Sequence, residues 1–355
     1  MALPDAPPSK KRPLPPESDI AVIGLAVMGQ NLILNMNDHG IKVTAFNRTT
    51  SKVDDFLAHE AKGTQIVGAH SIEEMMDSLK SPRRVLLLVK AGAAVDAFIE
   101  AILPHTEPGD IIIDAGNSLF SDTVRRTAHV EAAGRLYVGT GVSGGEEGAR
   151  TGPSIMPGGS AAAWPHVKPI LQAISAKAGE AEPCCQWVGS GGSGHYVKMV
   201  HNGIEYGDMQ LIAEAYHLMG AGLGMDAAEQ SAVFAEWDRG ELCSYLIEIT
   251  SAILAHKDSD GEPLVEKISD VTGQKGTGKW TGIEALEQGM PVTLIGEAVF
   301  ARCLSALKAQ RVIASAALAG PDEASLGSAR AAVRADKVAF VESIRQALLA
   351  SKIVS

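Results

Sequence analysis

The sequence predicts an α/β domain with a Rossmann-type, doubly wound sheet, followed by an all-α domain. Apolar strands alternate with amphipathic helices from Asp19 onward, and a glycine-patterned turn follows the first strand. Beyond a glycine-rich segment at 189–194, the apolar spacing is helical to the end of the chain. Alternating strands and helices indicate a parallel sheet covered by helices on both faces. We therefore expect a nucleotide-binding domain over 19–193 and an all-helical domain over 194–355.

Five short apolar segments predict the strands of this sheet, because each is rich in aliphatic residues and bounded by turn-forming residues. An amphipathic helix follows the first strand and ends at Gly40. The helix reads MGQNLILNMNDHG (28–40), and the strands read DIAVIG (19–24), KVTAFN (42–47), RRVLLLV (83–89), DIIIDAG (110–116) and LYVGTGVSGG (136–145).

The glycine-rich segment GSGGSG (189–194) has two interpretations. It is either a flexible linker or a tight loop that starts a helix and brings its backbone close to a neighbour. A strongly periodic helix follows at once, which favours the second interpretation. The last amphipathic stretch keeps its apolar spacing up to Ser355 without a capping glycine, so we expect that helix to continue. The amphipathic stretches of the helical domain are 195–220, 226–256, 291–318 and 336–354.

Composition and charge disfavour several classes of function. The formal net charge of −11 argues against a nucleic-acid partner, which needs a basic surface. No apolar run approaches the length of a membrane span, and no signal peptide is recognised. The four cysteines lack metal-site spacing, so we expect no metal and reduced thiols in the cytoplasm. Residues 1–18 predict a disordered, proline-rich tail, in which Lys10–Arg12 is at most a short nuclear-import patch.

A dinucleotide fingerprint lies where the first strand meets the first helix. It reads G-x-A-x-x-G, with alanine in place of the middle glycine. The first glycine permits a tight turn, the last permits close packing of helix and sheet, and the helix N-terminus receives the pyrophosphate. An ordinary βα turn is the alternative for the pattern by itself. The candidate cofactor residues are Gly24, Leu25, Ala26, Val27, Met28 and Gly29.

The end of the second strand favours NADP over NAD. NAD enzymes usually place an acidic residue there to bind the ribose hydroxyls. This chain has Asn47, Arg48 and Thr49, which offer a guanidinium and a hydroxyl suited to a 2′-phosphate. A solvated surface arginine is the alternative interpretation, and the fingerprint upstream argues against it.

Lys198 and Glu205 are the candidate catalytic pair. They are seven positions apart in a segment with helical spacing, which returns the chain to nearly the same face. His201 and Asn202 fall between them on the same stripe. A lone lysine on a helix is usually solvated and a lone histidine is usually structural. Together, however, the four groups offer a base, an acid and two polar binding groups, which predicts an active site for a small substrate.

The segment GQKGTGKW (273–280) has the spacing of a phosphate-binding P-loop as far as Lys279. Trp280 then stands where serine or threonine would reach magnesium, and no buried strand precedes the segment. We therefore reject a P-loop and interpret the segment as a glycine-rich loop that presents Lys275 to an anionic substrate. A surface loop with solvated lysines is the alternative.

These motifs resemble those of the NADP-dependent, decarboxylating 6-phosphogluconate dehydrogenase family of the pentose phosphate pathway. The resemblance implies that Lys198 accepts the C3 hydroxyl proton during hydride transfer and then assists decarboxylation of the 3-keto acid. It implies that Glu205 protonates C1 to give ribulose 5-phosphate, and that no metal is required. It extends from Asp19 to Ser355. The matching segments are GLAVMGQNL, AFNRT, LLVKAG, DAGNS, GVSGGEEGAR, VKMVHNGIEYGDMQL, GQKGTGKWT and VTLIGEAVFARCLS.

The resemblance also implies binding roles for further residues. Asn117 would contact both cofactor and substrate, and Lys275 and Arg302 would bind the substrate phosphate. The cofactor would also contact Val89, Lys90 and Ala91, and the sugar acid would contact Ser143, Gly144, Gly145, His201, Asn202 and Tyr206.

Two departures from the family pattern stand out. Ala115 and Leu119 replace the usual residues near Asn117, which we expect to tune this loop rather than abolish its role. The family also continues past the position of Ser355. That further segment completes the helical domain, reaches into the partner of a homodimer, and supplies an arginine and a histidine to the neighbour's phosphate site. We therefore expect an incomplete helical domain for substrate binding and dimerisation.

The sequence leaves three functions open. The first is oxidative decarboxylation of 6-phosphogluconate with NADP by a cytoplasmic homodimer. The second is a catalytically incomplete, NADP-binding isoform or fragment of that enzyme. The third is an enzyme that acts on another 3-hydroxy acid, against which the candidate phosphate ligands Lys275 and Arg302 argue.

Overall fold

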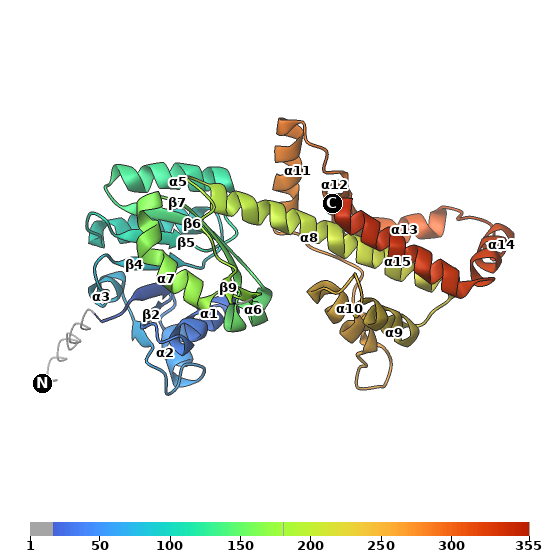
Figure 1. The fold of residues 1–355 in the computed structure, drawn as a ribbon, viewed down its shortest axis with the longest axis horizontal. Helices are drawn as coiled ribbons and strands as arrows, with labels where there is room; N and C mark the ends of the chain where they lie inside the picture. Colours follow the sequence, from blue (N-terminus) through green and yellow to red (C-terminus); the bar gives the residue numbers. More distant parts are fainter. Residues whose placement is uncertain (1–16, 180, 355) are drawn as a thin grey trace, which may run out of the picture. The chain divides into compact units, whose positions relative to one another are not determined.

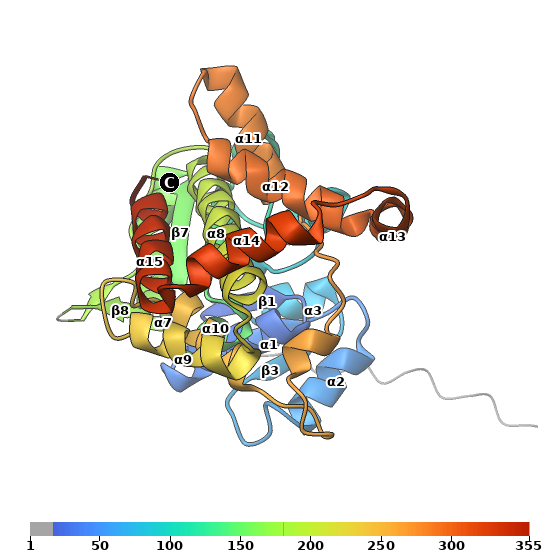
Figure 2. The same ribbon diagram turned by 90° about the vertical axis from the view of Figure 1, so that its right-hand side faces the viewer.

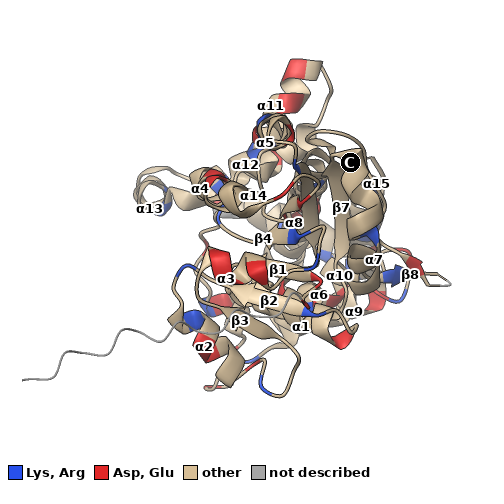
Figure 3. Ribbon diagram, turned by 90° about the vertical axis from the view of Figure 1, so that its left-hand side faces the viewer, with Lys and Arg blue, Asp and Glu red and all other residues tan. Residues whose placement is uncertain are grey.

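The computed structural model describes residues 17–179 and 181–354. The chain divides into two compact units, one on each side of the junction between Met199 and Val200. Among the described residues, no helix is long and apolar enough to cross a membrane, and no group of histidine, cysteine and acidic side chains is arranged to hold a metal ion. Acidic and basic segments are interspersed over the helices of the first unit (Figure 3).

The expected N-terminal tail over 1–18 falls mostly outside the described residues, and its Lys10–Arg12 run lies there too. Its last residue contradicts the expectation. Ser18 is buried, its amide donates to the Ser78 carbonyl oxygen at 3.0 Å, and its hydroxyl accepts a hydrogen bond from Thr44 at 2.9 Å. Ser18 therefore belongs to the first unit.

The first unit is built on a seven-stranded sheet, which confirms the doubly wound fold (Figure 1). The strands are β1 (Ile20–Ile23), β2 (Val43–Phe46), β3 (Val67–Ala69), β4 (Arg84–Leu87), β5 (Ile111–Asp114), β6 (Leu136–Ser143) and β7 (Ser154–Gly159). Their order is β3-β2-β1-β4-β5-β6-β7, and β1 to β6 run parallel. The order reverses between β1 and β4, where such sheets bind a dinucleotide at the carboxyl ends of the strands.

Two strands of the sheet, β3 and β7, were not predicted from the sequence. β3 has three residues, too few for a recognisable apolar run. β7 reads SIMPGG, whose proline and glycines disfavour a strand. It pairs antiparallel with β6 at the edge of the sheet, where proline is tolerated because no further strand needs its N–H. The sheet is therefore mixed rather than wholly parallel. A separate short pair, β8 (Lys177–Ala178) with β9 (Glu182–Pro183), is also absent from the sequence analysis.

Helices cover both faces of the sheet with separate apolar layers. Strand β1 shows the division, because Ile20 and Val22 belong to one layer while Ala21 and Ile23 belong to the other, all fully buried. The first layer receives α1 (Val27–Asp38), α2 (Ser51–Ala58) and α7 (Trp164–Ile174). The second receives α3 (Ile72–Asp77), α4 (Ala93–Ile102) and α5 (Phe120–Ala132). A short helix, α6 (Gly145–Thr151), follows β6.

The segment 189–194 forms a tight start to helix α8 (Ser193–Leu218), which contradicts the flexible-linker interpretation. A Cβ atom at Gly192 would lie 2.5 Å from the Phe120 carbonyl oxygen. A Cβ atom at Gly194 would lie 2.3 Å from the carbonyl oxygen of Gly139. Because no side chain fits at these positions, the first turn of α8 packs directly on α5 and β6.

The second unit is helical, as expected, and α8 and α15 (Lys337–Val354) match the predicted stretches 195–220 and 336–354, whereas each of the other two stretches is divided into two helices. After α8 come a π-helical turn (Met219–Leu223), α9 (Ala227–Trp237), α10 (Tyr245–Ala255), α11 (Thr277–Gln288), α12 (Thr293–Ala306), α13 (Lys308–Ala317), α14 (Glu323–Arg334) and α15 (Lys337–Val354). The predicted stretch 226–256 is divided between α9 and α10, and the stretch 291–318 is divided at Leu307. No predicted stretch corresponds to α11 or α14.

Apolar residues of α8, α9, α10 and α15 form the core of the second unit. Phe234 and Trp237 of α9 pack edge to face with ring centroids 5.0 Å apart, and Ile344 and Leu348 of α15 are buried in the same core. Figure 2 shows α9 and α10 side by side, and α11 folded back on α12. Helices α11, α12 and α13 contribute no residue to this core.

Candidate active site

The turn between β1 and α1 has the geometry that a bound dinucleotide requires. Gly24 has φ +115°, and a Cβ atom there would lie 2.3 Å from the Leu88 carbonyl oxygen. A Cβ atom at Gly29 would lie 1.9 Å from the Gly24 carbonyl oxygen. The N-cap residue Ala26 has no side chain that caps α1, and the first turn of α1 contains no acidic residue. The helix N-terminus therefore presents backbone N–H groups and the positive end of the helix dipole to an anion.

The residues after β2 adjoin this turn. The Asn47 side chain accepts a hydrogen bond from the Leu25 amide at 3.2 Å and donates to the Thr49 carbonyl oxygen at 3.1 Å. It thereby fixes the loop after β2 against the fingerprint. Arg48 and Thr49 are exposed. A guanidinium in this place fits the 2′-phosphate of NADP, and no carboxylate replaces it.

Two further loops lie at the carboxyl ends of neighbouring strands. Val89, Lys90 and Ala91 follow β4, and Asn117 follows β5, which pairs with β4. Asn117 is exposed, whereas Ala115 is buried, and its amide donates to the Leu87 carbonyl oxygen at 2.9 Å. Leu119, the other departure from the family pattern, precedes the first turn of α5. The parallel sheet therefore brings these candidate cofactor residues to the edge that carries Gly24.

The candidate substrate loop Ser143–Gly145 lies at the end of β6. Gly144 has φ +139°, and a Cβ atom there would lie 3.0 Å from Gly148 Cα. Gly145 has φ +61° and begins α6. Both positions favour glycine, so the backbone makes a sharp turn at the same sheet edge as the fingerprint.

Lys198 packs closely against β6 because position 141 of the strand is a glycine and has no side chain. A Cβ atom at Gly141 would lie 2.3 Å from Lys198 Cβ, so the lysine stem occupies the space above this glycine. Lys198 is only 6% exposed. Gly139, two residues earlier on the same face of the strand, leaves equivalent room for His195 and Thr123. Two alternating glycines of β6 thus position the start of α8.

His195 is a member of this site that the sequence analysis does not identify. It is 1% exposed, and its Nδ1 lies 2.7 Å from Thr123 Oγ1. Its Nε2 has no hydrogen-bond partner among the described residues. Burial lowers the pKa of His195, so the ring is neutral at physiological pH. Its position three residues before Lys198 places it on the lysine's face of α8, and this spacing is the one signal that the sequence offers.

The other groups of the predicted stripe lie further along α8. Glu205 Oε2 is 4.0 Å from His201 Nδ1, and the same nitrogen is 3.3 Å from Asn202 Oδ1. Each of the His201 and Glu205 side chains is about two-fifths exposed, at 39% and 40%. Lys198 and Glu205 belong to one helix, as the spacing predicts. The lysine is enclosed, whereas the carboxyl group is open to solvent.

The second unit groups Tyr206 with the two candidate phosphate ligands. The Arg302 guanidinium lies 3.7 Å from the centroid of the Tyr206 ring, and its Nη1 donates to the Gly273 carbonyl oxygen at 2.8 Å. The Lys275 amide donates to the Tyr206 hydroxyl at 3.4 Å. The lysine side chain is exposed. Two cations and an aromatic ring are thereby arranged around the loop before α11.

The segment 273–280 is not a loop throughout, which corrects part of the interpretation. α11 begins at Thr277, so Lys279 lies inside a helix. Gly276 adopts φ +98° and is covered by the Trp280 ring, which a Cβ atom there would approach to 3.0 Å. The element before this segment is a 3-10 helix (Leu264–Lys267) rather than a strand, so the segment is not a P-loop. Only Lys275 of the two lysines remains on the loop.

Comparisons with known proteins agree with these observations. Residues 19–189 match the NAD binding domain of 6-phosphogluconate dehydrogenase, and residues 194–355 match the C-terminal domain of 6-phosphogluconate dehydrogenase. The decarboxylating 6-phosphogluconate dehydrogenase of Mus musculus is 65% identical over 339 residues, which cover 96% of this chain and 69% of the relative. That of Cunninghamella elegans is 63% identical over 338 residues, which cover 95% and 68%.

Solved structures extend the comparison. The 6-phosphogluconate dehydrogenase of Plasmodium falciparum, solved in its apo form, with NADP+ and with 6-phosphogluconate, has a TM-score of 0.85 and 45% identity, covering 95% of this chain and 71% of that one. A 3-hydroxyisobutyrate dehydrogenase of Salmonella typhimurium, at 18% identity and a TM-score of 0.60 over 79% of this chain and 90% of its own, shares the fold alone. The chain belongs to the 6-phosphogluconate dehydrogenase family.

Proposed function

We propose that the chain catalyses NADP-dependent oxidative decarboxylation of 6-phosphogluconate to ribulose 5-phosphate and CO2. The observation that carries this proposal is the placement of Lys198 and Glu205. One is buried above Gly141, the other is half exposed, and both belong to the helix that begins at the Rossmann sheet. The names of the relatives and the conditions of the Plasmodium structure support the same reaction.

The residues of the first unit fit NADP. The uncapped N-terminus of α1 would receive the pyrophosphate, with Gly24 and Gly29 removing steric obstacles. Arg48 would pair with the 2′-phosphate. When bound, NADP supplies the acceptor for the hydride that leaves C3 of the substrate. Leu25, Ala26, Val27, Met28, Asn47, Thr49, Val89, Lys90, Ala91 and Asn117 would complete the cofactor site.

The chain's own groups account for the proton transfers. Lys198 accepts the proton of the C3 hydroxyl as hydride leaves the same carbon. The resulting 3-keto group takes up the electron pair of the C1–C2 bond when CO2 departs, and the lysine ammonium returns its proton to the developing oxyanion. Glu205 then donates a proton to the carbon that was C2 of the substrate and that becomes C1 of ribulose 5-phosphate. Its half-exposed position suits this role, because the carboxyl group must be protonated again from solvent.

The substrate's two ends would contact different groups. Ser143, Gly144, Gly145, Asn117, His201, Asn202 and Tyr206 would hold the sugar acid. Lys275 and Arg302 would bind the phosphate, for which two cations and an aromatic stack are suited. This pair argues against a 3-hydroxy acid without a phosphate group.

We also propose a cytoplasmic homodimer with the domain division at residues 193 and 194. Free cysteines are typical of reducing compartments.

Helices α12 and α13 lie outside the apolar core and expose Phe300 at 70%, Leu304 at 59% and Ile313 at 69%. An apolar surface of this kind is typical of a subunit interface. The double change Phe300→Asp and Ile313→Asp should halve the mass measured by light scattering, whereas Val338→Asp on α15 should leave it unchanged.

The decisive test combines turnover with direct cofactor binding. Lys198→Met should abolish NADPH formation from 6-phosphogluconate while leaving the NADPH dissociation constant nearly unchanged. A large loss of cofactor affinity in this variant would contradict the base role. Binding of NADPH by the parent chain without any turnover would instead support the catalytically incomplete alternative.

Arg48→Glu tests the choice of cofactor. This variant should weaken the binding of NADP far more than the binding of NAD, because a carboxylate repels the 2′-phosphate and accepts hydrogen bonds from the ribose hydroxyls. Equal losses for the two cofactors would contradict the assignment of Arg48.

A further inference from the structure

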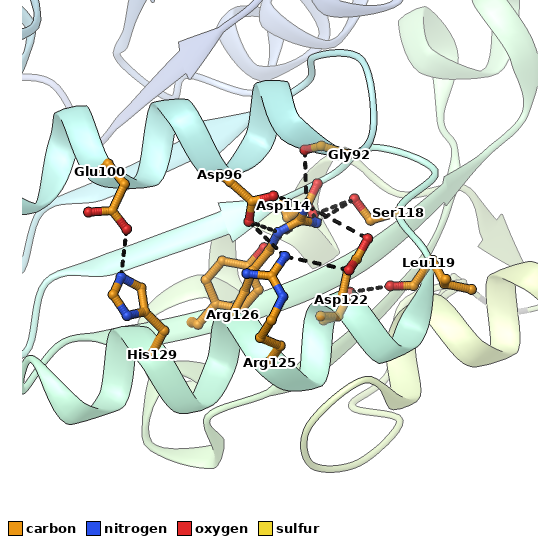
Figure 4. Close-up of polar contacts among 12 residues, drawn as sticks. Gly92, Asp96, Glu100, Asp114, Ser118, Leu119, Asp122, Arg125, Arg126 and His129 are labelled. Atoms are coloured by element: carbon orange, nitrogen blue, oxygen red, sulfur yellow. Dashed lines mark hydrogen bonds and ion pairs between the residues drawn. The ribbon is translucent and has the colours of Figure 1, made fainter.

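A buried arginine, which the catalytic scheme does not use, lies beneath the cofactor side of the first unit. Arg126 of α5 is 1% exposed. Its guanidinium holds Asp96 of α4 with two hydrogen bonds, from Nε at 2.8 Å and from Nη2 at 3.1 Å (Figure 4). Such bidentate contact fixes the plane of the guanidinium and hence the direction of its remaining donors.

The remaining contacts reach the two loops that follow β4 and β5. Nη2 donates to the Gly92 carbonyl oxygen at 3.0 Å, next to the candidate cofactor residues Lys90 and Ala91. Nη1 donates to Ser118 Oγ at 3.2 Å and lies 3.4 Å from Asp114 Oδ2. One guanidinium therefore bonds both loops at once (Figure 4).

Asp114, which Arg126 contacts, is hydrogen-bonded to Gly116 and Ser118, the two residues on either side of Asn117. Its Oδ1 accepts the Gly116 amide at 3.1 Å, and its Oδ2 accepts the Ser118 hydroxyl at 2.6 Å. The Tyr137 hydroxyl donates to the same Oδ2 at 3.1 Å. Burial raises the pKa of Tyr137 well above its usual value, so this hydroxyl remains a donor. Because Asp114 is fully buried, it depends on Arg126 for its countercharge.

We propose that Arg126 is a positioning residue for the reaction. It holds the loops 89–92 and 115–119 in one fixed geometry and thereby sets Asn117 relative to the cofactor and the substrate. It contacts neither molecule. The proposal rests on the proposed function, since that function places these two loops at the cofactor.

The neighbouring Arg125 offers a matched control. Its Nη2 bonds the same Asp96 oxygen at 2.9 Å, but its side chain is 56% exposed and bonds neither loop. We would compare Arg126→Lys with Arg125→Gln. Lysine keeps the charge but lacks the planar fork that bridges the loops. Hydrogen–deuterium exchange of the cofactor-free protein, NADPH affinity by fluorescence titration, and kcat and KM below the thermal transition would be measured for each variant.

In Arg126→Lys, amide exchange should rise in 89–92 and 115–119 together, while β1 and the second unit keep parental rates. The NADPH dissociation constant should rise and kcat should fall by roughly tenfold each, the effect of losing charged hydrogen bonds. Arg125→Gln should match the parent within about twofold. Parental exchange and affinity in Arg126→Lys would overturn the proposal. So would a uniform rise in exchange with unchanged kinetic constants, which a merely structural arginine would give.

If Arg126→Lys does not fold, Ser118→Ala replaces it. This variant removes the hydroxyl between Arg126 and Asp114 and keeps both buried charges paired with each other. It should loosen 115–119 and lower kcat, and parental behaviour would overturn the proposal. A parent chain that fails to bind NADPH would contradict the proposed function, whereas the exchange of the two loops would still decide whether Arg126 holds them.

Discussion

The two units position their candidate functional groups in different ways. In the first unit, the backbone conformation and buried polar groups fix the positions of the candidate functional groups. Gly24 has φ +115°, and Arg126 is 1% exposed. In the second, Lys275 is exposed, and Arg302 is placed by the face of the Tyr206 ring. Substitutions in the first unit should therefore disturb geometry and turnover. Substitutions in the second should mainly weaken substrate binding.

Outside the candidate catalytic pair, the largest effect should come from Gly141→Ala in the first unit. Its new Cβ atom would lie 2.3 Å from Lys198 Cβ, so α8 must shift away from β6. A displacement of this size should reduce turnover by about a hundredfold or more and lower the unfolding free energy by about 1–3 kcal/mol. Gly282→Ala in α11 is the control, since a Cβ atom there meets nothing within 4 Å. Steady-state kinetics and urea unfolding would measure both. Equal behaviour of the two variants would contradict the contrast between the units.

A medium effect should come from Lys275→Gln in the second unit. Loss of one charged contact to the phosphate should raise KM for 6-phosphogluconate by about tenfold while kcat stays within about threefold. Lys279→Gln is matched in chemistry and exposure, but it lies inside α11 and should leave KM unchanged. A larger effect at Lys279 than at Lys275 would assign the phosphate site elsewhere.

The smallest effect should come from Asp96→Asn, which tests the buried network through pH. Hydrogen bonds from Arg126 are the main cause that lowers the pKa of Asp96 from 3.8 to about 2. Because the folded pKa is depressed, the ionised carboxylate stabilises the fold above pH 3.8, and this contribution is lost as the pH falls toward 2. We expect the asparagine variant to cost about 1 kcal/mol near neutral pH, since partial exposure screens the pair.

Urea unfolding of parent and variant at several pH values would measure this difference. It should shrink as the pH falls from the neutral range through the Asp96 pKa. A difference that does not change with pH would mean that the carboxylate charge contributes nothing to the stability of the network.

Fully buried strands were readily predicted from the sequence, whereas edge strands were not. Segments such as DIAVIG and DIIIDAG read as continuous apolar runs because both faces of β1 and β5 are covered by helices. β7 was missed because an edge strand can carry the proline and glycines that a central strand excludes. In the second unit the apolar spacing predicted α8 and α15 to within two residues, but it did not predict the break at Leu307, because neither glycine nor proline marks that position.

The positions of the candidate cofactor residues follow from the topology, since parallel strands end at one edge. Their roles, like those of Lys198 and Glu205, remain predictions. Arg126 was beyond sequence reasoning for a physical reason. Arg125 and Arg126 are adjacent, and only the fold shows which one is buried. His195 was missed because a lone histidine on a helix carries no sign of its contact with Thr123.

The glycines of β6 also determine how the chain tolerates changes in length. Side chains alternate along a strand, so Gly139 and Gly141 face α8 while Thr140, equally buried, faces the other way. Inserting or deleting one residue before Gly139 would reverse this alternation and bring the threonine under the helix. Lys198 would then lose the space for its stem although no residue of the active site had been substituted. Within β6, a change of length should therefore be more damaging than most changes of residue type.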